Sequence, residues 1–259
     1  MRIRQSFCYG LFQAEGVSLD ELLAAAGKIG YAAVELWQPG DDLEDLVALA
    51  GKHGLAVASM SGHESLADGL NKRSNHDRIE AELRGSIDRA AKLGIAGLIC
   101  FSGNRQPHVT DREAIDAVAD GLRRVAPHAE EKGINLNLEL LNSKVDHAGY
   151  QCDRTAWGAA VCEKIASPRV KLLYDIYHMQ IMEGDVIRTI RENIRWIGHF
   201  HTAGVPGRND FDDAQELNYV GICQAIAASG YDLYLGHEFK PKGDPIEALR
   251  RAFEICDRQ

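Results

Sequence analysis

The sequence predicts an α/β fold, a single (β/α)8 TIM barrel that covers residues 1–259 as one domain. Eight short apolar runs alternate with eight longer amphipathic runs, and about 32 residues for each pair is close to the repeat of such a barrel. In addition, acidic residues and a histidine end four successive apolar runs. No segment of biased composition divides the chain.

The predicted strands are short runs rich in β-branched and large apolar residues, as is typical of buried strands. They cover residues 3–8, 33–37, 55–60, 97–101, 134–141, 170–176, 196–202 and 233–239. The predicted helices are rich in Ala, Leu, Glu and Lys. They cover residues 19–29, 43–53, 75–93, 111–132, 154–165, 185–193, 215–229 and 245–256.

Residues typical of helix ends support several of these boundaries. Ser18 and Asp111 stand at positions where a helix N-cap is expected. Gly94 and Gly133 follow helices whose last residues include lysine, which predicts C-terminal glycine caps. A doubly wound open sheet is the alternative, but its first turn usually carries G-x-G-x-x-G, which this chain lacks after its first strand.

Composition excludes several classes of protein. The net charge is −9, from 29 basic and 38 acidic residues, which argues against nucleic acid as a partner. No apolar run of about 18 residues is available to span a membrane, and the start, MRIRQSFCYG, lacks the apolar segment of a secretory signal. A cytoplasmic protein is expected, and its six widely spaced cysteines, without C-x-x-C, predict buried free thiols.

Four potential metal ligands end four successive predicted strands. Glu139, Asp175, His201 and Glu238 are each separated by about one βα unit. Strand alternation places Glu139 on the inner face of the barrel, because Leu138 and Leu140 on either side of it face outward. We therefore expect the four side chains to meet at the C-terminal mouth of the barrel, where active sites of this fold lie.

Three carboxylates and one imidazole gathered in a buried place repel one another unless a cation neutralises them. Oxygen and nitrogen ligands suit one divalent ion, Mn²⁺, Mg²⁺, Co²⁺ or Zn²⁺. The alternative is that each acidic group pairs with Lys or Arg at the barrel rim. Four matched strand ends favour the metal site.

Residues near these ligands are candidates for substrate binding. His178 follows Asp175 by three residues in a predicted loop. Arg208 follows a Pro-Gly turn, and its guanidinium suits a carboxylate or phosphate. Asn142 and Lys240 lie just after the fifth and eighth strands, and solvent exposure is the alternative for all four.

Strand alternation leaves open whether Glu35, near the end of the second strand, faces inward. The same uncertainty applies to His63, after the third strand.

The segments ELLNSKVDH, LLYDIYHMQIMEGD, GHFHTAGVPGR and GHEFKP resemble the hydroxypyruvate isomerase family, a branch of the xylose isomerase-like barrels. The resemblance runs from QSFCYG at 5–10 to GHEFKP at 236–241 and implies a single metal in a TIM barrel. It implies that Glu139 and Glu238 are catalytic acid/base residues that also bind the metal, with Asp175 as another ligand. The sequence departs at His201, where that branch carries glutamine and the related ketose 3-epimerases carry histidine.

The implied reaction is isomerisation of a keto-acid or sugar by proton transfer through an enediolate, as for hydroxypyruvate. Epimerisation at carbon 3 and a keto-sugar lyase reaction are alternatives that use the same site. An alternative of another class is a catalytically silent sugar-acid-binding protein, which the intact Glu139 and Glu238 disfavour. Barrels of this kind often associate, so a homo-oligomer is possible.

Overall fold

Eight parallel strands form a barrel in the computed structural model, which describes residues 2–258. Neighbouring strands pair in the order β1-β8-β7-β6-β5-β4-β3-β2, and a parallel bridge between Cys8 and Glu35 joins the two outermost strands. The predicted barrel is therefore confirmed. The strands are β1 (Arg4–Phe7), β2 (Ala33–Glu35), β3 (Ala56–Ser61), β4 (Gly97–Cys100), β5 (Asn135–Glu139), β6 (Val170–Asp175), β7 (Ile197–Thr202) and β8 (Tyr234–His237).

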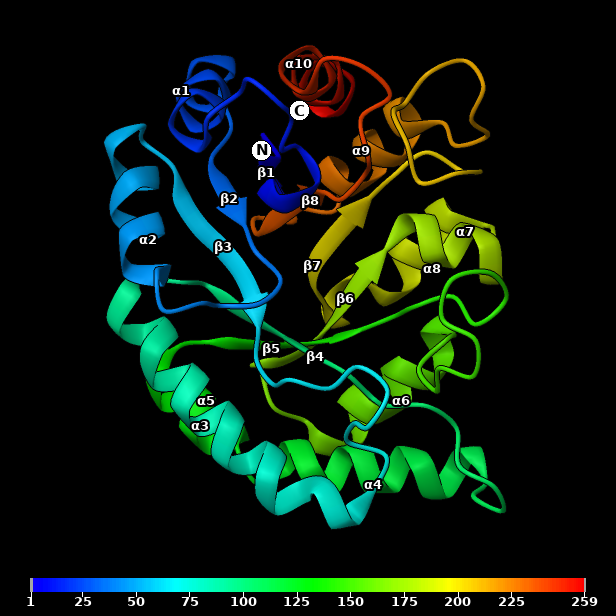
Figure 1. Ribbon diagram of the computed structural model, residues 1–259. Helices are drawn as coiled ribbons and strands as arrows, with labels where there is room; N and C mark the ends of the chain where they lie inside the picture. The colour runs from blue at the N-terminus through cyan, green and yellow to red at the C-terminus, as the bar shows by residue number, and fades with distance from the viewer. Residues whose placement is uncertain (1, 259) are drawn as a thin grey trace.

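Helices surround the barrel on its outside, as Figure 1 shows in a view into the barrel. They are α1 (Leu19–Ile29), α2 (Leu43–Lys52), α3 (His76–Leu93), α4 (Asp111–Arg123), α5 (Ala126–Lys132), α6 (Thr155–Ile165), α7 (Ile176–Met182), α8 (Val186–Asn193), α9 (Tyr219–Ala228) and α10 (Pro245–Cys256). Short 3₁₀ helices lie at Tyr9–Leu11, Arg73–Asn75 and Ile194–Trp196.

The helices differ from the prediction in three places. The single helix predicted over 111–132 is two helices, α4 and α5, and Pro127 lies in the first turn of α5, where its missing N–H is tolerated. The segment predicted as a loop after Asp175 is the helix α7. The helix predicted over 215–229 begins only at Tyr219, because the Asn218 side chain caps it there.

Most helix-end predictions agree with the structure. Ser18 caps α1 by accepting a hydrogen bond from a backbone N–H of the first turn. The N-cap of α4 is Thr110 and not Asp111, which is the first residue inside that helix, where its charge still suits the helix dipole. Gly94 and Gly133 have positive φ angles of 72° and 74° at the ends of α3 and α5, as predicted.

Asn137 fills the barrel interior below the mouth. A Cβ added to Gly97 on β4 would lie 2.6 Å from its Nδ2, and one added to Gly198 on β7 would lie 2.3 Å from its Oδ1. The amide therefore spans the barrel between two strands that glycines keep open. Because side chains alternate along a strand, Glu139 points to the same interior two residues closer to the mouth.

The outward faces of the strands pack against the helices. Leu140 and Leu172 approach α6 at Gly158, where an added Cβ would lie 3.0 Å and 2.8 Å from their Cδ2 atoms. All six cysteines are buried free thiols, as predicted. Among residues 2–258, no helix combines the length and the apolar character needed to cross a membrane.

Candidate active site

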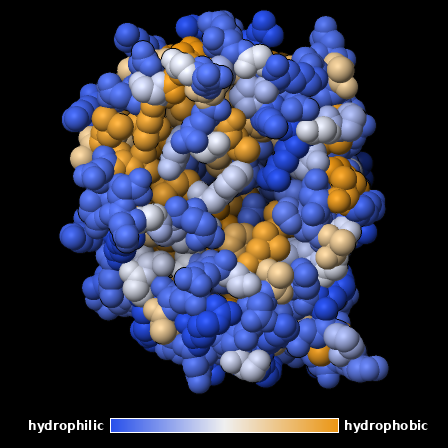
Figure 2. Space-filling model, viewed as in Figure 1, coloured by the Kyte–Doolittle hydropathy of each residue, from blue (hydrophilic) through white to orange (hydrophobic). Residues whose placement is uncertain are grey.

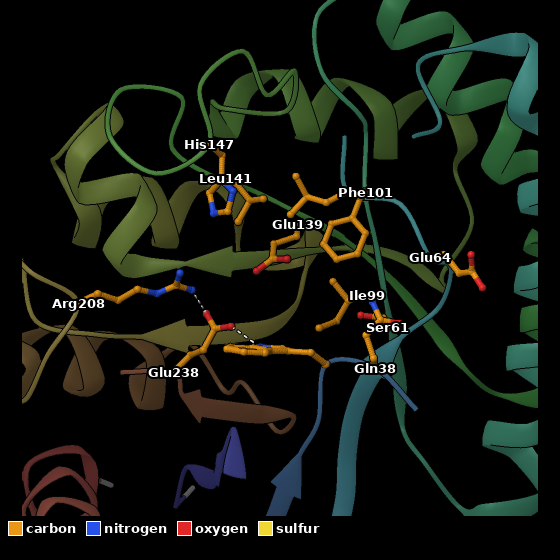
Figure 3. Close-up of a pocket in the computed structure, with 12 residues that line it drawn as sticks. Gln38, Ser61, Glu64, Ile99, Phe101, Glu139, Leu141, His147, Arg208 and Glu238 are labelled. Atoms are coloured by element: carbon orange, nitrogen blue, oxygen red, sulfur yellow. Dashed lines mark hydrogen bonds and ion pairs between the residues drawn. The ribbon is translucent and has the colours of Figure 1, made fainter. Parts of the chain in front are cut away.

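Four predicted ligands come together at the C-terminal mouth of the barrel. Glu139 and Asp175 end β5 and β6, His201 lies near the end of β7, and Glu238 directly follows β8. All four are buried, and one potential ligand atom from each lies within 4.8 Å of the others. Figure 3 shows Glu139 and Glu238 reaching the pocket from opposite sides.

His201 lies at the centre of this group. Its Nδ1 is 3.2 Å from Oε2 of Glu238 and 3.7 Å from Oε1 of Glu139. This buried nitrogen has no hydrogen-bond partner among the described residues. Because buried polar atoms are normally paired, an unpaired ring nitrogen between two carboxylates indicates a site for a cation.

The charges of the site depend on one another. Burial and the charge of Glu238 raise the pKa of Asp175 to about 7. Burial also acts to raise the pKa of Glu238, but the charges of Arg208 and His201 outweigh it and hold that pKa well below its ordinary value. Three carboxylates thus share one imidazole and one guanidinium, a surplus of negative charge that a divalent cation would neutralise.

The donor set therefore fits a divalent metal ion. Carboxylate oxygens and one imidazole nitrogen are ligands suited to Mn²⁺, Mg²⁺, Co²⁺ and Zn²⁺. A second group, formed by Cys8, Glu35 and His201, also has potential ligand atoms within 4.8 Å of one another. It shares His201 with the first group.

Arg208 reaches the site from the loop after β7. Its backbone has a positive φ of 56° after Gly207, at 97°, a conformation uncommon for a residue with a side chain. The guanidinium forms an ion pair with Glu238, lies 4.0 Å from Oδ2 of Asp175 and stacks over the ring of Tyr177. Its side chain is 28% exposed, so it faces both the carboxylates and the pocket.

His178 lies in α7 and not in a loop, so the predicted loop location was wrong. It is fully buried, and its Nδ1 receives a hydrogen bond of 2.6 Å from the Asn142 side chain. Its Nε2 has no partner among the described residues and lies 3.6 Å from Oδ2 of Asp175. Burial and the charge of Arg208 lower the pKa of His178 well below its ordinary value, so Nε2 is a neutral N–H donor beside the site.

Asn142 and Lys240 occupy different environments. Asn142 is buried, and its Oδ1 accepts hydrogen bonds from the backbone of Val145 and Asp146. These bonds fix the amide group, whose Nδ2 donates to Nδ1 of His178. The Lys240 side chain is exposed, and it is not among the residues that line the pocket. The backbone of Lys240 donates to the carbonyl of Arg208 at 2.9 Å.

The pocket beside the four groups has a volume of about 320 Å³. Figure 2 shows a hollow near the centre of this face, with apolar residues in its walls and a mainly hydrophilic surround. The apolar lining consists of Trp37, Leu66, Ile99, Phe101 and Leu141, and the polar lining of Gln38, Ser61, Glu64, Glu139, His147, Arg208 and Glu238. Only part of this lining was predicted, although many of the other residues lie at or just beyond strand ends.

Two residues left open by the sequence have clear positions. Glu35 faces inward, where its carboxylate lies 2.9 Å from His199 and 3.2 Å from His201. Burial acts to raise the pKa of Glu35, but these two histidines outweigh it and hold the pKa below its ordinary range. His63 is buried outside the pocket, and its Nε2 accepts a hydrogen bond from the backbone of Phe101.

Comparisons with known proteins agree with this architecture. The sequence model of the xylose isomerase-like TIM barrel family matches residues 23–258. The chain is 35% identical over 179 residues to a 2-oxo-tetronate isomerase of Cupriavidus necator, and the aligned segment covers 66% of each protein. It is 30% identical over 252 residues to a putative hydroxypyruvate isomerase of Homo sapiens, and the aligned segment covers 93% of this chain and 91% of that protein.

A solved structure supports the fold. The crystal structure of an AP endonuclease of family 2 from Brucella melitensis superimposes with a TM-score of 0.84, covering 99% of each chain at 21% identity. At this identity the likeness shows the fold alone.

Proposed function

The chain belongs to the xylose isomerase-like TIM barrel family, and from this we infer that it is an isomerase acting on small sugar acids. Relatives over most of its length are named putative hydroxypyruvate isomerase or 2-oxo-tetronate isomerase, which supports this activity. The observation that carries the proposal is the meeting of three carboxylates and one imidazole, within 4.8 Å, in the barrel mouth. We propose further that residues 1–259 act as one barrel domain.

One divalent metal ion would be held by Glu139, Asp175, His201 and Glu238. Such an ion, when bound, stabilises the negative charge that develops on oxygen as a proton leaves the carbon beside a carbonyl. The unpartnered Nδ1 of His201 and the excess of carboxylates support this assignment.

Glu139 and Glu238 are the proposed catalytic acid and base. They come from β5 and from the end of β8, on opposite sides of the pocket (Figure 3). One carboxylate removes the proton from the hydroxyl-bearing carbon, and a carboxylate returns a proton to the neighbouring carbonyl carbon. The hydroxyl proton passes to the former carbonyl oxygen, so the carbonyl moves to the adjacent carbon of the substrate. General acid–base catalysis of this kind contributes about 10²–10⁴-fold in rate.

The substrate carboxylate is the proposed partner of Arg208. Its guanidinium already binds a carboxylate, that of Glu238, and a fork of N–H groups suits an anionic end group. His178 offers a neutral Nε2–H donor to a substrate oxygen, and Asn142 fixes that ring through Nδ1. The exposed Lys240 is assigned a weaker role, contact with substrate at the pocket edge.

Epimerisation is the second candidate function. Two carboxylates on opposite sides of a substrate can remove a proton from one face of a carbon and return one to the other face. The same pair of glutamates therefore supports 3-epimerisation of a ketose. A keto-sugar lyase reaction begins with the same proton abstraction, and a silent sugar-acid-binding protein would have no use for either base.

A substrate panel in D₂O tests the proposal. The purified, metal-loaded protein is incubated with hydroxypyruvate, four-carbon keto-acids and free ketoses, and products are followed by NMR. We expect carbonyl migration with deuterium incorporation for an acid substrate. Inversion at carbon 3 of a ketose, with no reaction of the acids, would establish the epimerase instead. Binding without any exchange of hydrogen would contradict both.

A further inference from the structure

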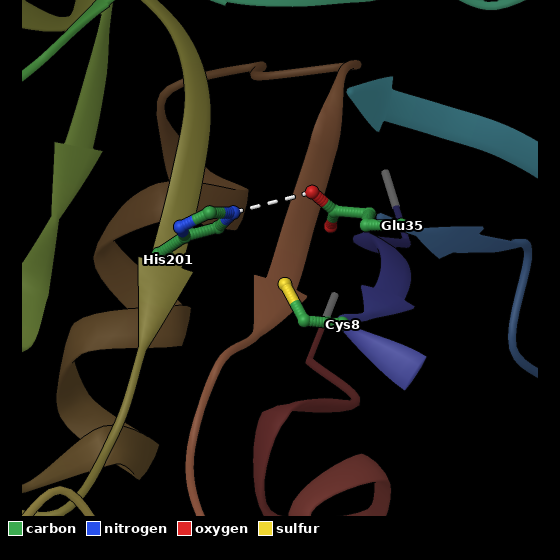
Figure 4. Close-up of side chains that lie close together, drawn as sticks. All are labelled: Cys8, Glu35 and His201. Carbon is green, nitrogen blue, oxygen red and sulfur yellow. Dashed lines mark hydrogen bonds and ion pairs between the residues drawn. The ribbon is translucent and has the colours of Figure 1, made fainter. Parts of the chain in front are cut away.

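His201 faces a second carboxylate on the side away from the four-residue site. Its Nε2 lies 3.2 Å from Oε2 of Glu35 on β2, and the two side chains are 0% and 1% exposed. Figure 4 shows the imidazole nitrogen and the Glu35 carboxylate facing each other, with Cys8 beside them. The two nitrogens of one ring thus face two different groups of carboxylates.

Glu35 is itself held firmly. The hydroxyl of Ser6 donates a hydrogen bond of 2.5 Å to Oε1, and Nε2 of His199 lies 2.9 Å from Oε2. Ser6 thus fixes Oε1, while His199 lies close to Oε2 without forming a hydrogen bond. A side chain fixed in this way can define the orientation of the ring that it contacts.

Strand β8 leaves room for this contact. A Cβ added to Gly236 would lie 2.1 Å from Oε1 of Glu35 and 3.1 Å from Cδ2 of His201. Glu35 comes from β2 and His201 from β7, and β1 and β8 lie between these strands in the barrel wall. The glycine thus allows the carboxylate to cross in front of β8 and reach the ring.

The contact has a chemical consequence for the ring. An imidazole that binds a metal through one nitrogen carries its proton on the other nitrogen, which needs an acceptor. Glu35 is the acceptor for Nε2, so Nδ1, which faces Glu139 and Glu238, is the nitrogen available to a metal ion. Histidines that bind metals commonly donate their other N–H to a carboxylate, which fixes the tautomer and the orientation of the ring.

We propose that Glu35 is a positioning residue of the metal centre, which accepts the Nε2–H of His201 and directs Nδ1 toward the metal. This inference rests on the metal centre proposed above. The competing interpretation is that Cys8, Glu35 and His201 bind a second cation of their own. Each nitrogen of His201 would then need a lone pair, and Nε2 could no longer donate to Glu35.

Calorimetric titration of the metal-free protein with Mn²⁺ tests the proposal. We expect one ion per chain, and a loss of affinity of about 10–100-fold for Glu35→Ala. Glu35→Gln keeps an acceptor oxygen without the charge and should lose less. The matched control is Asp153→Asn, because Asp153 is also a buried carboxylate held by a hydroxyl and an arginine. A purely structural role would leave the Mn²⁺ affinity of folded Glu35 variants equal to that of this control, and that result would overturn the proposal.

Long-range ¹H–¹⁵N NMR of the parent protein provides a test that requires no Glu35 variant. We expect the ring of His201, assigned from its absence in His201→Gln, to carry its proton on Nε2 after loading with Zn²⁺, because Nδ1 then binds the ion. A proton on Nδ1 in the Zn²⁺-loaded protein, or two ions bound per chain, would overturn the proposal. If the parent binds no divalent ion while Nε2 carries the proton, the metal centre fails and the contact between Glu35 and His201 stands.

Discussion

The indole Nε1 of Trp37 donates a hydrogen bond of 2.7 Å to Oε1 of Glu238, while Oε2 of the same carboxylate faces His201 and Arg208. Each oxygen of the proposed base therefore has its own partner. Trp37 is 43% exposed and lines the pocket. It thus forms part of the pocket wall and also fixes the direction in which Glu238 points.

Replacing Trp37 with phenylalanine removes this donor and keeps an aromatic wall. A hydrogen bond to a charged group contributes about 1.5–3 kcal/mol, so we expect kcat to fall by about 10-fold or more. The value of KM should change less, because the aromatic surface remains. Steady-state kinetics measure both, with Trp196→Phe as the control, since that indole contacts Arg195 away from the pocket. Equal kcat values for the two variants would show that Trp37 serves only as a wall.

The variant Arg208→Ala should bind an acid substrate poorly. Loss of a charge-assisted pair costs about 1.5–3 kcal/mol, so we expect KM for the acid to rise by about 10–100-fold, with a smaller effect on kcat. The metal content should persist, because Arg208 is not a proposed ligand. An unchanged KM for every acid that the parent accepts would contradict the carboxylate assignment and would favour a ketose substrate.

The meeting of the four candidate ligands was predictable from the sequence because the carboxyl ends of parallel strands meet at one end of a barrel. One βα unit between successive candidates was enough to bring Glu139, Asp175, His201 and Glu238 together. The inward direction of Glu35 was not predictable. Its strand has three residues, and the pairing with β3 shifts register between Val34 and Glu35, so alternation cannot be counted through it.

The helix α7 was missed for a related reason. Its residues Ile176–Met182 are largely buried, so no polar face alternates with an apolar one to give a helical period. Asp175 ends β6 and also caps this helix, because its side chain accepts the backbone N–H of His178. A strand that passes directly into a buried helix offers no loop composition to mark the boundary. Trp37 and Phe101 line the pocket because of the path of the loops after β2 and β4. The hydrophobic pattern of the sequence does not specify such paths.

The free energy of unfolding should decrease as the pH is lowered, because of His63. Burial lowers the pKa of His63 to about 4, whereas an unfolded histidine titrates near pH 6.5. Between these values the unfolded chain binds a proton that the folded chain does not, so the free energy of unfolding decreases as the pH falls from about 6.5 to about 4. The loss from this residue is roughly 3 kcal/mol over that range.

Denaturant unfolding of the parent and of His63→Gln, measured at several pH values, isolates this effect. Gln retains an acceptor for the Phe101 N–H that His63 binds at 2.9 Å, but it does not titrate. We expect the difference in unfolding free energy between the two proteins to change with pH below about 6.5 and to be constant above it. A difference independent of pH would show that folded His63 titrates normally.

Metal binding should stabilise the fold. A ligand at about 100 times its dissociation constant adds about 2.7 kcal/mol, which raises Tm by about 5–10 °C in a chain of this size. Differential scanning fluorimetry of the chelator-treated protein with added Mn²⁺ measures the rise. Asp175→Asn should reduce it, whereas Asp153→Asn, a buried carboxylate outside the four-residue site, should keep it. Equal shifts in both variants would place the ion elsewhere.

The two proposed bases can be separated by isotope exchange. The variants Glu139→Gln and Glu238→Gln keep the side-chain shape and one ligating oxygen but remove the base. Each should lower turnover by about 10²-fold or more, the scale of general acid–base loss. Proton removal and proton return are separate steps, so the variant that keeps the base for the first step should still exchange substrate hydrogen with D₂O, because abstraction is reversible.

NMR measures exchange and turnover in parallel, and metal content is determined for each variant. The control is Glu64→Gln, because Glu64 lines the same pocket but is not one of the four grouped ligands. If both variants turn over as fast as this control, Glu139 and Glu238 serve only to bind the metal. If one variant exchanges without turnover and the other does neither, the first has lost the residue that returns the proton and the second the residue that removes it.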